Sequence, residues 1–253
     1  MLKTRVIPIL LLDQNYLVKT TQFKNAYYLG DPINAVRIFN EFEIPEIIVL
    51  DISQNWELKQ PNFGLIELIA IECNMPLTYG GGIKNIEQVR QIISLGVEKI
   101  VINTAAFMNP ELIKNLSNEF GSQSIVGSID VKKDFWGRYK VYVKNGKLNT
   151  GKNPFEYAKI LENLGIGELL ITFIPHEGTY KGYEQQLIYD ISRHLSIPVI
   201  ANGGAGNYND FKLAVVSGAS AVAASNLFLF HNKQKTGFLI NYPSKEVLSQ
   251  YLN

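Results

Sequence analysis

Residues 46–51 have the sequence Glu-Ile-Ile-Val-Leu-Asp, a short apolar run that begins and ends on a carboxylate. An apolar run of this length without alternation is typical of a parallel strand that is buried on both faces of a sheet. Seven similar runs occur elsewhere in the chain, and amphipathic segments of helical length separate most of them. The predicted strands are 6–12, 46–51, 76–79, 99–103, 124–130, 168–173, 198–201 and 220–224. The predicted helices include 32–43, 85–95, 110–119, 154–164 and 210–217.

This alternation of strands and helices predicts an α/β fold. Eight βα units in a chain of 253 residues match the length of one closed barrel. We therefore expect residues 1–253 to form a single (β/α)8 TIM-barrel domain. The alternative is a doubly wound open sheet. A dinucleotide-binding sheet of that type needs a Gly-x-Gly-x-x-Gly turn after its first strand, and this chain has none there.

Two segments interrupt the alternation. Residues 12–30 form a long polar connection after the first strand, and we expect a mobile loop over the site. Residues 135–151 alternate between polar and apolar side chains around Asn145-Gly146. This pattern predicts a β-hairpin inserted after the fifth strand.

The composition is that of a folded globular protein, with 46% hydrophobic and 19% charged residues. A formal net charge of +1 creates no overall field for nucleic acid or an anionic membrane, so we expect neither as a partner. The first apolar run is too short to cross a bilayer, and the single cysteine, Cys73, cannot form an intrachain disulfide. These features predict a cytoplasmic protein. Because His, Cys and Asp do not cluster at metal-ligand spacing, we expect no metal ion, and we expect no other cofactor.

Glycine-rich and small-residue motifs repeat between the two halves of the chain. Gly-Gly-Gly at 80–82 and Asn-Thr-Ala-Ala at 103–106 follow the third and fourth strands. Gly-Gly-Ala-Gly at 203–206 follows the seventh strand, and Ala-Ala-Ser at 223–225 lies at the end of the eighth. Glycine lets backbone N–H groups approach an anion closely, and the start of a helix adds partial positive charge. The repeat predicts a two-fold half-barrel plan with two phosphate cradles at the barrel mouth.

Several strand ends carry groups suited to acid–base chemistry. Asp130 closes the fifth strand and is the best candidate for a general acid or base, although an aspartate there can also cap a turn. Asp51 closes the second strand in the same way, and a structural role is an equal alternative. Lys19, in the long first connection, can cover a bound anion or remain a solvated loop lysine.

Taken together, these motifs resemble the cyclase subunit of imidazole glycerol phosphate synthase. The resemblance runs from the first strand to the eighth, over about nine-tenths of the chain, and is specific as a set. The motifs are Arg-Val-Ile-Pro at 5–8, Val-Lys-Thr-Thr at 18–21, Gly-Asp-Pro at 30–32, Val-Leu-Asp-Ile at 49–52, Tyr-Gly-Gly-Gly-Ile at 79–83, Ile-Asn-Thr-Ala-Ala at 102–106, Gly-Ser-Gln at 121–123, and the two small-residue motifs at 203–206 and 223–225.

The resemblance implies two phosphate sites for a bis-phosphorylated ligand. One lies near Gly82, Asn103 and Thr104. The other lies near Gly178, Gly204, Ala224 and Ser225. In the family, ammonia from a glutaminase partner enters the bottom of the barrel through a charged gate. Arg5, Glu46, Lys99 and Glu168 match the gate, and the glutaminase would dock at this N-terminal face.

Two departures from the family concern the chemistry. The family uses an aspartate at the end of the first strand, and here Leu11 occupies that position. Asp13 lies on the same face, about 6–7 Å further out, and is a candidate substitute. After the sixth strand the family's Asp-Arg-Asp-Gly-Thr becomes Pro-His-Glu-Gly-Thr at 175–179. Glu177 there is the expected acidic neighbour of the distal phosphate.

Three functions follow from this combination. The first is a paralogue linked to acetamidino modification of bacterial surface sugars, as in lipopolysaccharide biosynthesis, that passes ammonia towards a separate sugar amidotransferase. Features at 10–12, 19–25 and 239–243 resemble such paralogues. The second is a cyclase of histidine biosynthesis, a lyase. The third is a non-catalytic sensor that activates the glutaminase when its phosphate sites are filled.

Overall fold

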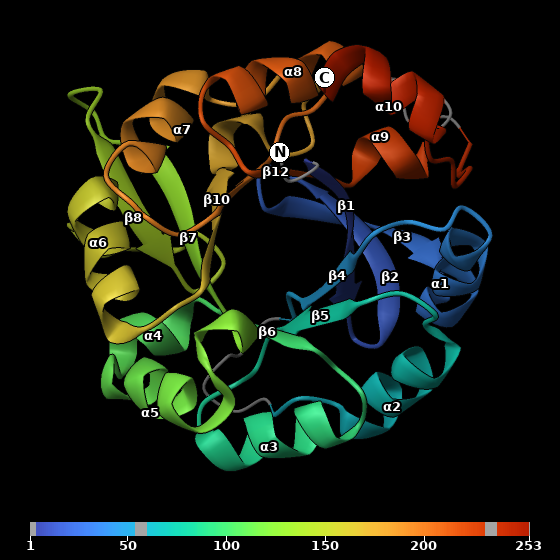
Figure 1. The fold of residues 1–253 in the computed structure, drawn as a ribbon, viewed down its shortest axis with the longest axis horizontal. Coiled ribbons are helices and arrows are strands. Elements are labelled where there is room, and N and C mark those ends of the chain that lie inside the picture. The colour runs from blue at the N-terminus through green and yellow to red at the C-terminus, as the bar shows by residue number, and fades with distance from the viewer. Residues whose placement is uncertain (1–3, 54–59, 231–236, 253) are drawn as a thin grey trace.

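Eight parallel strands close into a barrel with helices around it (Figure 1). The computed structural model describes residues 4–53, 60–230 and 237–252. Neighbouring barrel strands pair in the order of the chain, and pairing of β10 with β7 completes the circuit. The barrel strands are β1 (Arg5–Asp13), β4 (Ile47–Asp51), β5 (Leu77–Gly80), β6 (Lys99–Ile102), β7 (Ile125–Lys133), β10 (Glu168–Phe173), β11 (Val199–Asn202) and β12 (Ala221–Ala224). The predicted (β/α)8 barrel is therefore confirmed.

The helices follow one another around the outside of the barrel (Figure 1). Several begin at a residue that accepts a backbone N–H, as Asp31, Asn85 and Asn153 do, which satisfies one of the unpaired donors of the first turn. The helices are α1 (Pro32–Asn40), α2 (Phe63–Glu72), α3 (Ile86–Ser94), α4 (Thr104–Met108), α5 (Glu111–Phe120), α6 (Pro154–Leu164), α7 (Gln185–Ser192), α8 (Tyr208–Val216), α9 (Asn226–Leu229) and α10 (Lys245–Leu252). Short 3₁₀ turns are η1 (Ser122–Ser124) and η2 (Ile174–His176).

The long connection after β1 forms a β-hairpin, so the prediction of a loop without strands over 12–30 is wrong. Strand β2 (Tyr16–Thr21) pairs antiparallel with β1, and β3 (Lys24–Gly30) pairs with β2. After β7, strand β8 (Tyr139–Val143) pairs antiparallel with both β7 and β9 (Leu148–Asn149). Each insertion extends the barrel sheet beyond the carboxyl ends of the strands.

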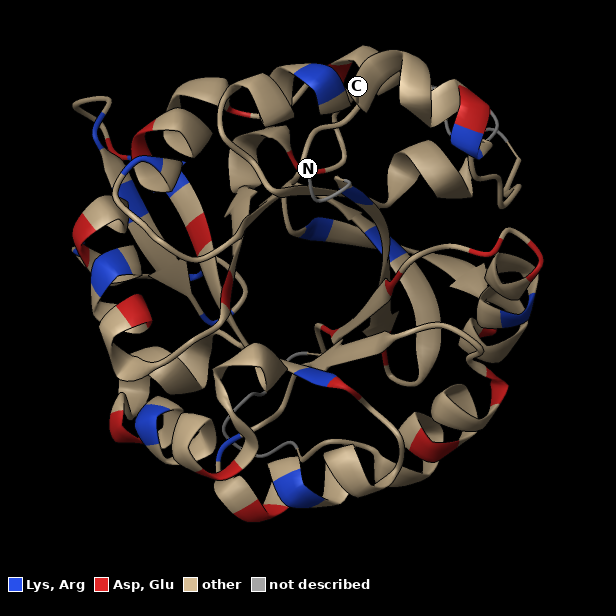
Figure 2. Cartoon of the chain, viewed as in Figure 1, with Lys and Arg blue, Asp and Glu red and all other residues tan. Residues whose placement is uncertain are grey.

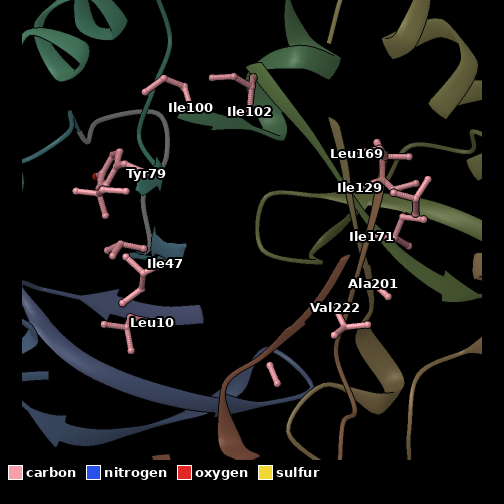
Figure 3. Close-up of a cluster of buried hydrophobic side chains, with 14 of the residues drawn as sticks. Leu10, Ile47, Tyr79, Ile100, Ile102, Ile129, Leu169, Ile171, Ala201 and Val222 are labelled. Carbon is pink, nitrogen blue, oxygen red and sulfur yellow. The ribbon is translucent and has the colours of Figure 1, made fainter. Parts of the chain in front are cut away.

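Alternation along each strand divides the core into two layers. Leu10, Ile129, Ile171 and Ala201 belong to the larger layer between the strands and the helices, and Figure 3 shows their side chains. The strand residues on either side point the other way. These inward residues form a second apolar cluster inside the barrel. It comprises Ile7, Ile9, Leu11, Val18, Ile48, Val101, Val126, Leu170, Ile200, Ala221 and Ala223.

Across the described ranges, none of the helices has the length and apolar character needed to cross a bilayer.

Candidate active site

A cavity of about 540 Å³ opens at the carboxyl ends of the barrel strands. Every residue predicted from the sequence to lie at the mouth lines this one cavity. They are Asp13, Lys19, Asp51, Gly82, Asn103, Thr104, Asp130, Glu177, Gly178, Gly204, Ala224 and Ser225. The volume lies within the usual range for small-molecule sites.

The two halves of the barrel present the same backbone to the cavity. The glycine turn after β5 has positive φ at Gly81 and Gly82, and the turn after β11 has positive φ at Gly203 and Gly204. A short helix begins one βα unit after each turn. The residue before each helix has a similar backbone conformation: φ −116° and ψ −87° at Asn103 before α4, and φ −118° and ψ −68° at Ser225 before α9. Each half therefore combines a glycine turn with the N-terminal end of a helix.

Only glycine fits at the tightest point of each turn. A Cβ on Gly81 would lie 2.3 Å from the Asp51 carbonyl oxygen, and one on Gly204 would lie 2.2 Å from the Gly182 carbonyl oxygen. Beside the second turn, the hydroxyl oxygen of Ser225 is buried without a hydrogen-bond partner among the described residues. Buried polar groups are normally paired, so this hydroxyl is available to a ligand atom.

Asp130 lies on β7 inside the polar half of the cavity and is 8% exposed. Its Oδ2 accepts a hydrogen bond from Asn103 Nδ2 at 3.0 Å. Burial raises the pKa of Asp130 to about 7, although the hydrogen bond from Asn103 and the charge of Lys132 act in the opposite direction. A carboxyl group with this pKa can both accept and release a proton near neutral pH.

Lys19 is not a loop residue but a buried member of β2, 4% exposed. Its ammonium group forms an ion pair with Glu177. Glu177 also accepts hydrogen bonds from the Thr20 hydroxyl at 3.2 Å and from the Phe23 N–H at 3.1 Å. The loop after β10 therefore holds the β2–β3 hairpin against the cavity.

The carboxyl end of β1 presents two different side chains to the cavity, Leu11 and Asp13. Leu11 is buried, and Asp13 is the half-buried last residue of the strand. Asp51, at the end of the neighbouring β4, accepts the Ser53 N–H at 2.9 Å. The lining from β1 and β4 thus combines the apolar Leu11 with two carboxylates, Asp13 and Asp51.

A ring of charges occupies the opposite end of the barrel. Arg5 donates to Glu46 at 2.5 Å and to Glu168 at 2.9 Å. Lys99 lies 3.4 Å from Glu46 and 3.2 Å from Glu168. The four predicted floor residues are thus joined in alternating order of charge. Figure 2 shows charged segments on the inner strands as well as on the helices.

The ring neutralises its own charges. Glu46, 2% exposed, also accepts the Thr78 hydroxyl at 3.0 Å. Burial opposes the charge on Arg5, but Glu168 and Glu46 outweigh it and raise the pKa of Arg5. Glu168 Oε2 is buried without a hydrogen-bond partner within the described part of the chain. One acceptor atom of the ring therefore has no donor among the described residues.

The polar cavity residues that were missed at the sequence level include Ser128, Thr172 and Asn202. Thr172 interrupts the apolar run of β10, and Asn202 directly precedes the second glycine turn. A polar residue in an otherwise apolar strand was the available signal. The β8–β9 turn also reaches the cavity, where the Lys144 N–H donates to the Thr104 hydroxyl at 3.0 Å.

Comparison with known proteins agrees with this geometry. A family model described as "Histidine biosynthesis protein" matches residues 5–234. The chain belongs to this family. It is 48% identical over 244 residues to "Putative imidazole glycerol phosphate synthase subunit hisF2" of Pseudomonas aeruginosa, covering 96% of this chain and 97% of that protein.

Other relatives carry related names. A protein of Leptospira borgpetersenii with a HisF name is 46% identical, over 96% of both chains. "Imidazole glycerol phosphate synthase subunit HisF" of Alkaliphilus metalliredigens is 38% identical, over 91% of this chain and 92% of that protein. The chain is thus a HisF-type barrel. Within its described residues, no group of three or more His, Cys, Asp or Glu side chains is arranged to hold a metal ion.

Proposed function

We propose that this HisF-type barrel is the synthase subunit of a glutamine amidotransferase complex. It receives ammonia from a glutaminase subunit docked at the N-terminal face. It binds a bis-phosphorylated ligand at the carboxyl face and works without a metal or cofactor. We further propose that it serves acetamidino-sugar biosynthesis and delivers ammonia to a separate sugar amidotransferase.

The charged ring supports a controlled entrance for ammonia. Arg5, Glu46, Lys99 and Glu168 pair with one another across the floor. Because a buried charge is costly without its partners, the ring favours a closed arrangement. The unpaired Glu168 Oε2 can accept a hydrogen bond from ammonia, which has N–H donors.

The interior of the barrel supports a path for the neutral molecule. Between the ring and the cavity lie apolar side chains, with the small Ala221 and Ala223 on β12. Ammonium would lose its hydration there without compensation, whereas neutral ammonia would lose far less. The apolar layer therefore favours transfer of ammonia as an uncharged species.

The observation that carries the proposal is the contrast between a complete charged floor and Leu11 at the mouth. Leucine has no proton to transfer, so Asp130 lacks the second carboxylate that the family's cyclization uses at this position. Such a chain keeps the means to receive ammonia but loses part of the lyase chemistry. This combination favours a role outside histidine synthesis.

The first experiment is a turnover assay of the purified chain with the phosphoribulosyl imidazole-carboxamide substrate and an ammonium salt. We expect binding of this substrate with turnover reduced by about 10²-fold or more, the usual contribution of one placed acid–base group. The control is Leu11→Asp, which we expect to raise turnover. Rapid turnover by the unmodified chain would reject the proposal and return the protein to histidine synthesis.

The second experiment tests the floor. In a complex with the cognate glutaminase, we expect charge reversal by Lys99→Glu or Glu168→Lys to uncouple glutamine hydrolysis from ammonia delivery. Arg90→Glu, on an exposed pair with Glu119, is the matched control. Ammonia delivery that is indifferent to both reversals would rule out the channel.

One observation favours a second candidate, a cyclase of histidine biosynthesis. Asp13 lines the same cavity as Asp130, so a second carboxylate lies near the mouth although not at position 11. In that case Asp13→Asn would abolish turnover in the first experiment. Under the main proposal the same substitution has little effect.

A further inference from the structure

Three neighbouring strands bring Asp130, Thr172 and Asn202 side by side. In the parallel register, Thr172 on β10 lies opposite Asp130 on β7 and also opposite Asn202 on β11. The preceding residues Ile129, Ile171 and Ala201 point into the outer layer (Figure 3). Because side chains alternate along a strand, all three polar residues point into the barrel.

The three side chains form a series. Asn202 Nδ2 donates to Thr172 Oγ1 at 3.0 Å. Thr172 lies beside Asp130 across the β7–β10 pairing, where its side chain acts to lower the pKa of the Asp130 carboxyl group against the larger effect of burial. A hydroxyl carries a single hydrogen but two acceptor positions. With the Asn202 amide occupying an acceptor position, the Thr172 hydrogen is directed towards Asp130.

We propose that Asn202 is a positioning residue that controls the protonation of Asp130 through Thr172. Asn202 immediately precedes Gly203 and Gly204, whose φ values are +88° and +117°. We call the series Asn202, Thr172 and Asp130 the relay. It connects the second glycine turn to the acid–base group across two strand pairings. An anion bound at that turn would act on Asp130 through the orientation of Asn202.

Other groups also surround the carboxyl group of Asp130 and affect its protonation. Asn103, directly after β6, donates to it. Lys132 on β7 and Glu177 after η2 act on it through their charges. Tyr142 on β8 lies opposite it in register. Substitutions at 172 and 202 leave these four residues in place, so a change in titration reports on the relay.

The test is a carbon-13 NMR titration of aspartate carboxyl carbons in the ligand-free protein. Asp130→Asn identifies the Asp130 signal, which we expect to titrate near pH 7. Thr172→Val, close in shape, removes a hydrogen bond to the charged form and should raise the midpoint by about 0.5–1 pH unit. Thr172→Ser keeps the hydroxyl and should restore the midpoint of the unmodified protein.

Asn202→Leu tests the outer member of the relay. We expect a smaller rise, because the Thr172 hydroxyl loses the partner that orients it. In the double variant with Thr172→Val, the leucine should add nothing, since the path from position 202 is already interrupted. An unchanged midpoint in Asn202→Leu, or additive shifts in the double variant, would overturn the relay.

This inference takes Asp130 as the acid–base group of the proposed function, but its test requires no substrate. A failed turnover experiment with the expected titration shifts would reject the proposed function and leave the relay intact. Normal glutaminase coupling without these shifts would reject the relay alone. Retained dispersion of the NMR spectrum distinguishes a folded variant from a collapsed one.

Discussion

The floor and the mouth of this barrel both contain buried carboxylates, but the two regions neutralise them differently. At the floor, Glu46 has two cationic partners and a hydroxyl donor. At the mouth, Asp130 accepts from the neutral amide of Asn103 and has no salt bridge within the described residues. At the floor, cationic partners offset the cost of burying a carboxylate, whereas at the mouth burial raises the pKa of Asp130 to about 7. The difference separates a floor of paired charges from a site that can exchange protons.

Of the substitutions considered, removal of Glu46 should change the free energy of unfolding most. Glu46→Ala removes the most buried member of the ring and leaves Arg5 and Lys99 sharing only Glu168 among the described residues. We expect the free energy of unfolding to fall by about 3–5 kcal/mol, the usual cost of breaking a buried pair. Urea denaturation measures this change. The exposed pair of Arg90 with Glu119 is the control, and Arg90→Ala should cost less than about 1 kcal/mol. Equal losses in the two variants would contradict the distinction.

At the mouth, removing the carboxyl group of Asp130 should stabilise the protein, whereas removing Glu46 destabilises it. Burial raises the pKa of Asp130 from 3.8 to about 7, so the folded protein retains a proton that the unfolded chain releases between about pH 4 and 7. The stabilisation that comes from this bound proton is therefore fully present below pH 4 and is lost as the pH rises towards 7. Asparagine does not ionise.

We thus expect Asp130→Asn to be about as stable as the unmodified protein at pH 4 and more stable by about 2–4 kcal/mol at pH 8. Thermal unfolding at several pH values measures the difference. Asp134→Asn, in the β7–β8 turn, provides the contrast: hydrogen bonds from Arg138 and Trp136 outweigh desolvation and lower the pKa of that carboxyl group, so its removal should cost stability as the pH rises. A stability gain that does not grow with pH would show that Asp130 is not held with a raised pKa.

Breaking the Lys19–Glu177 pair should change the free energy of unfolding least. The pair is charged and buried, as the pairs of the floor are, but it lies at the mouth. Lys19→Met keeps the apolar part of the side chain, and Glu177 retains donors from Thr20 and Phe23. We expect a loss of about 1–3 kcal/mol. Adding Glu177→Gln should recover most of it, since no buried charge then remains. Chemical denaturation of the single and double variants measures the coupling, and simple additivity would argue against a buried ion pair.

Sequence patterns predicted the barrel and most of its mouth because both depend on local properties of the chain. Apolar runs identify the strands, and the carboxyl ends of parallel strands necessarily meet at one edge of a barrel. Asp51 and Asp130 were therefore placed correctly at the cavity from their positions alone. The floor residues were identified through the family resemblance, and they lie at or next to the starts of four strands.

The partners of these residues were decided by the tertiary structure. Lys19 and Glu177 are 158 residues apart, and no local pattern indicated that a polar connection would form a hairpin and bury its lysine. Thr172 lies beside Asp130, and Asn202 beside Thr172, only because barrel closure fixes the register of β7, β10 and β11. Local periodicity determines which face a side chain occupies. The register between distant strands determines what it touches, and at this mouth the closed barrel buries Asp130 and so raises its pKa.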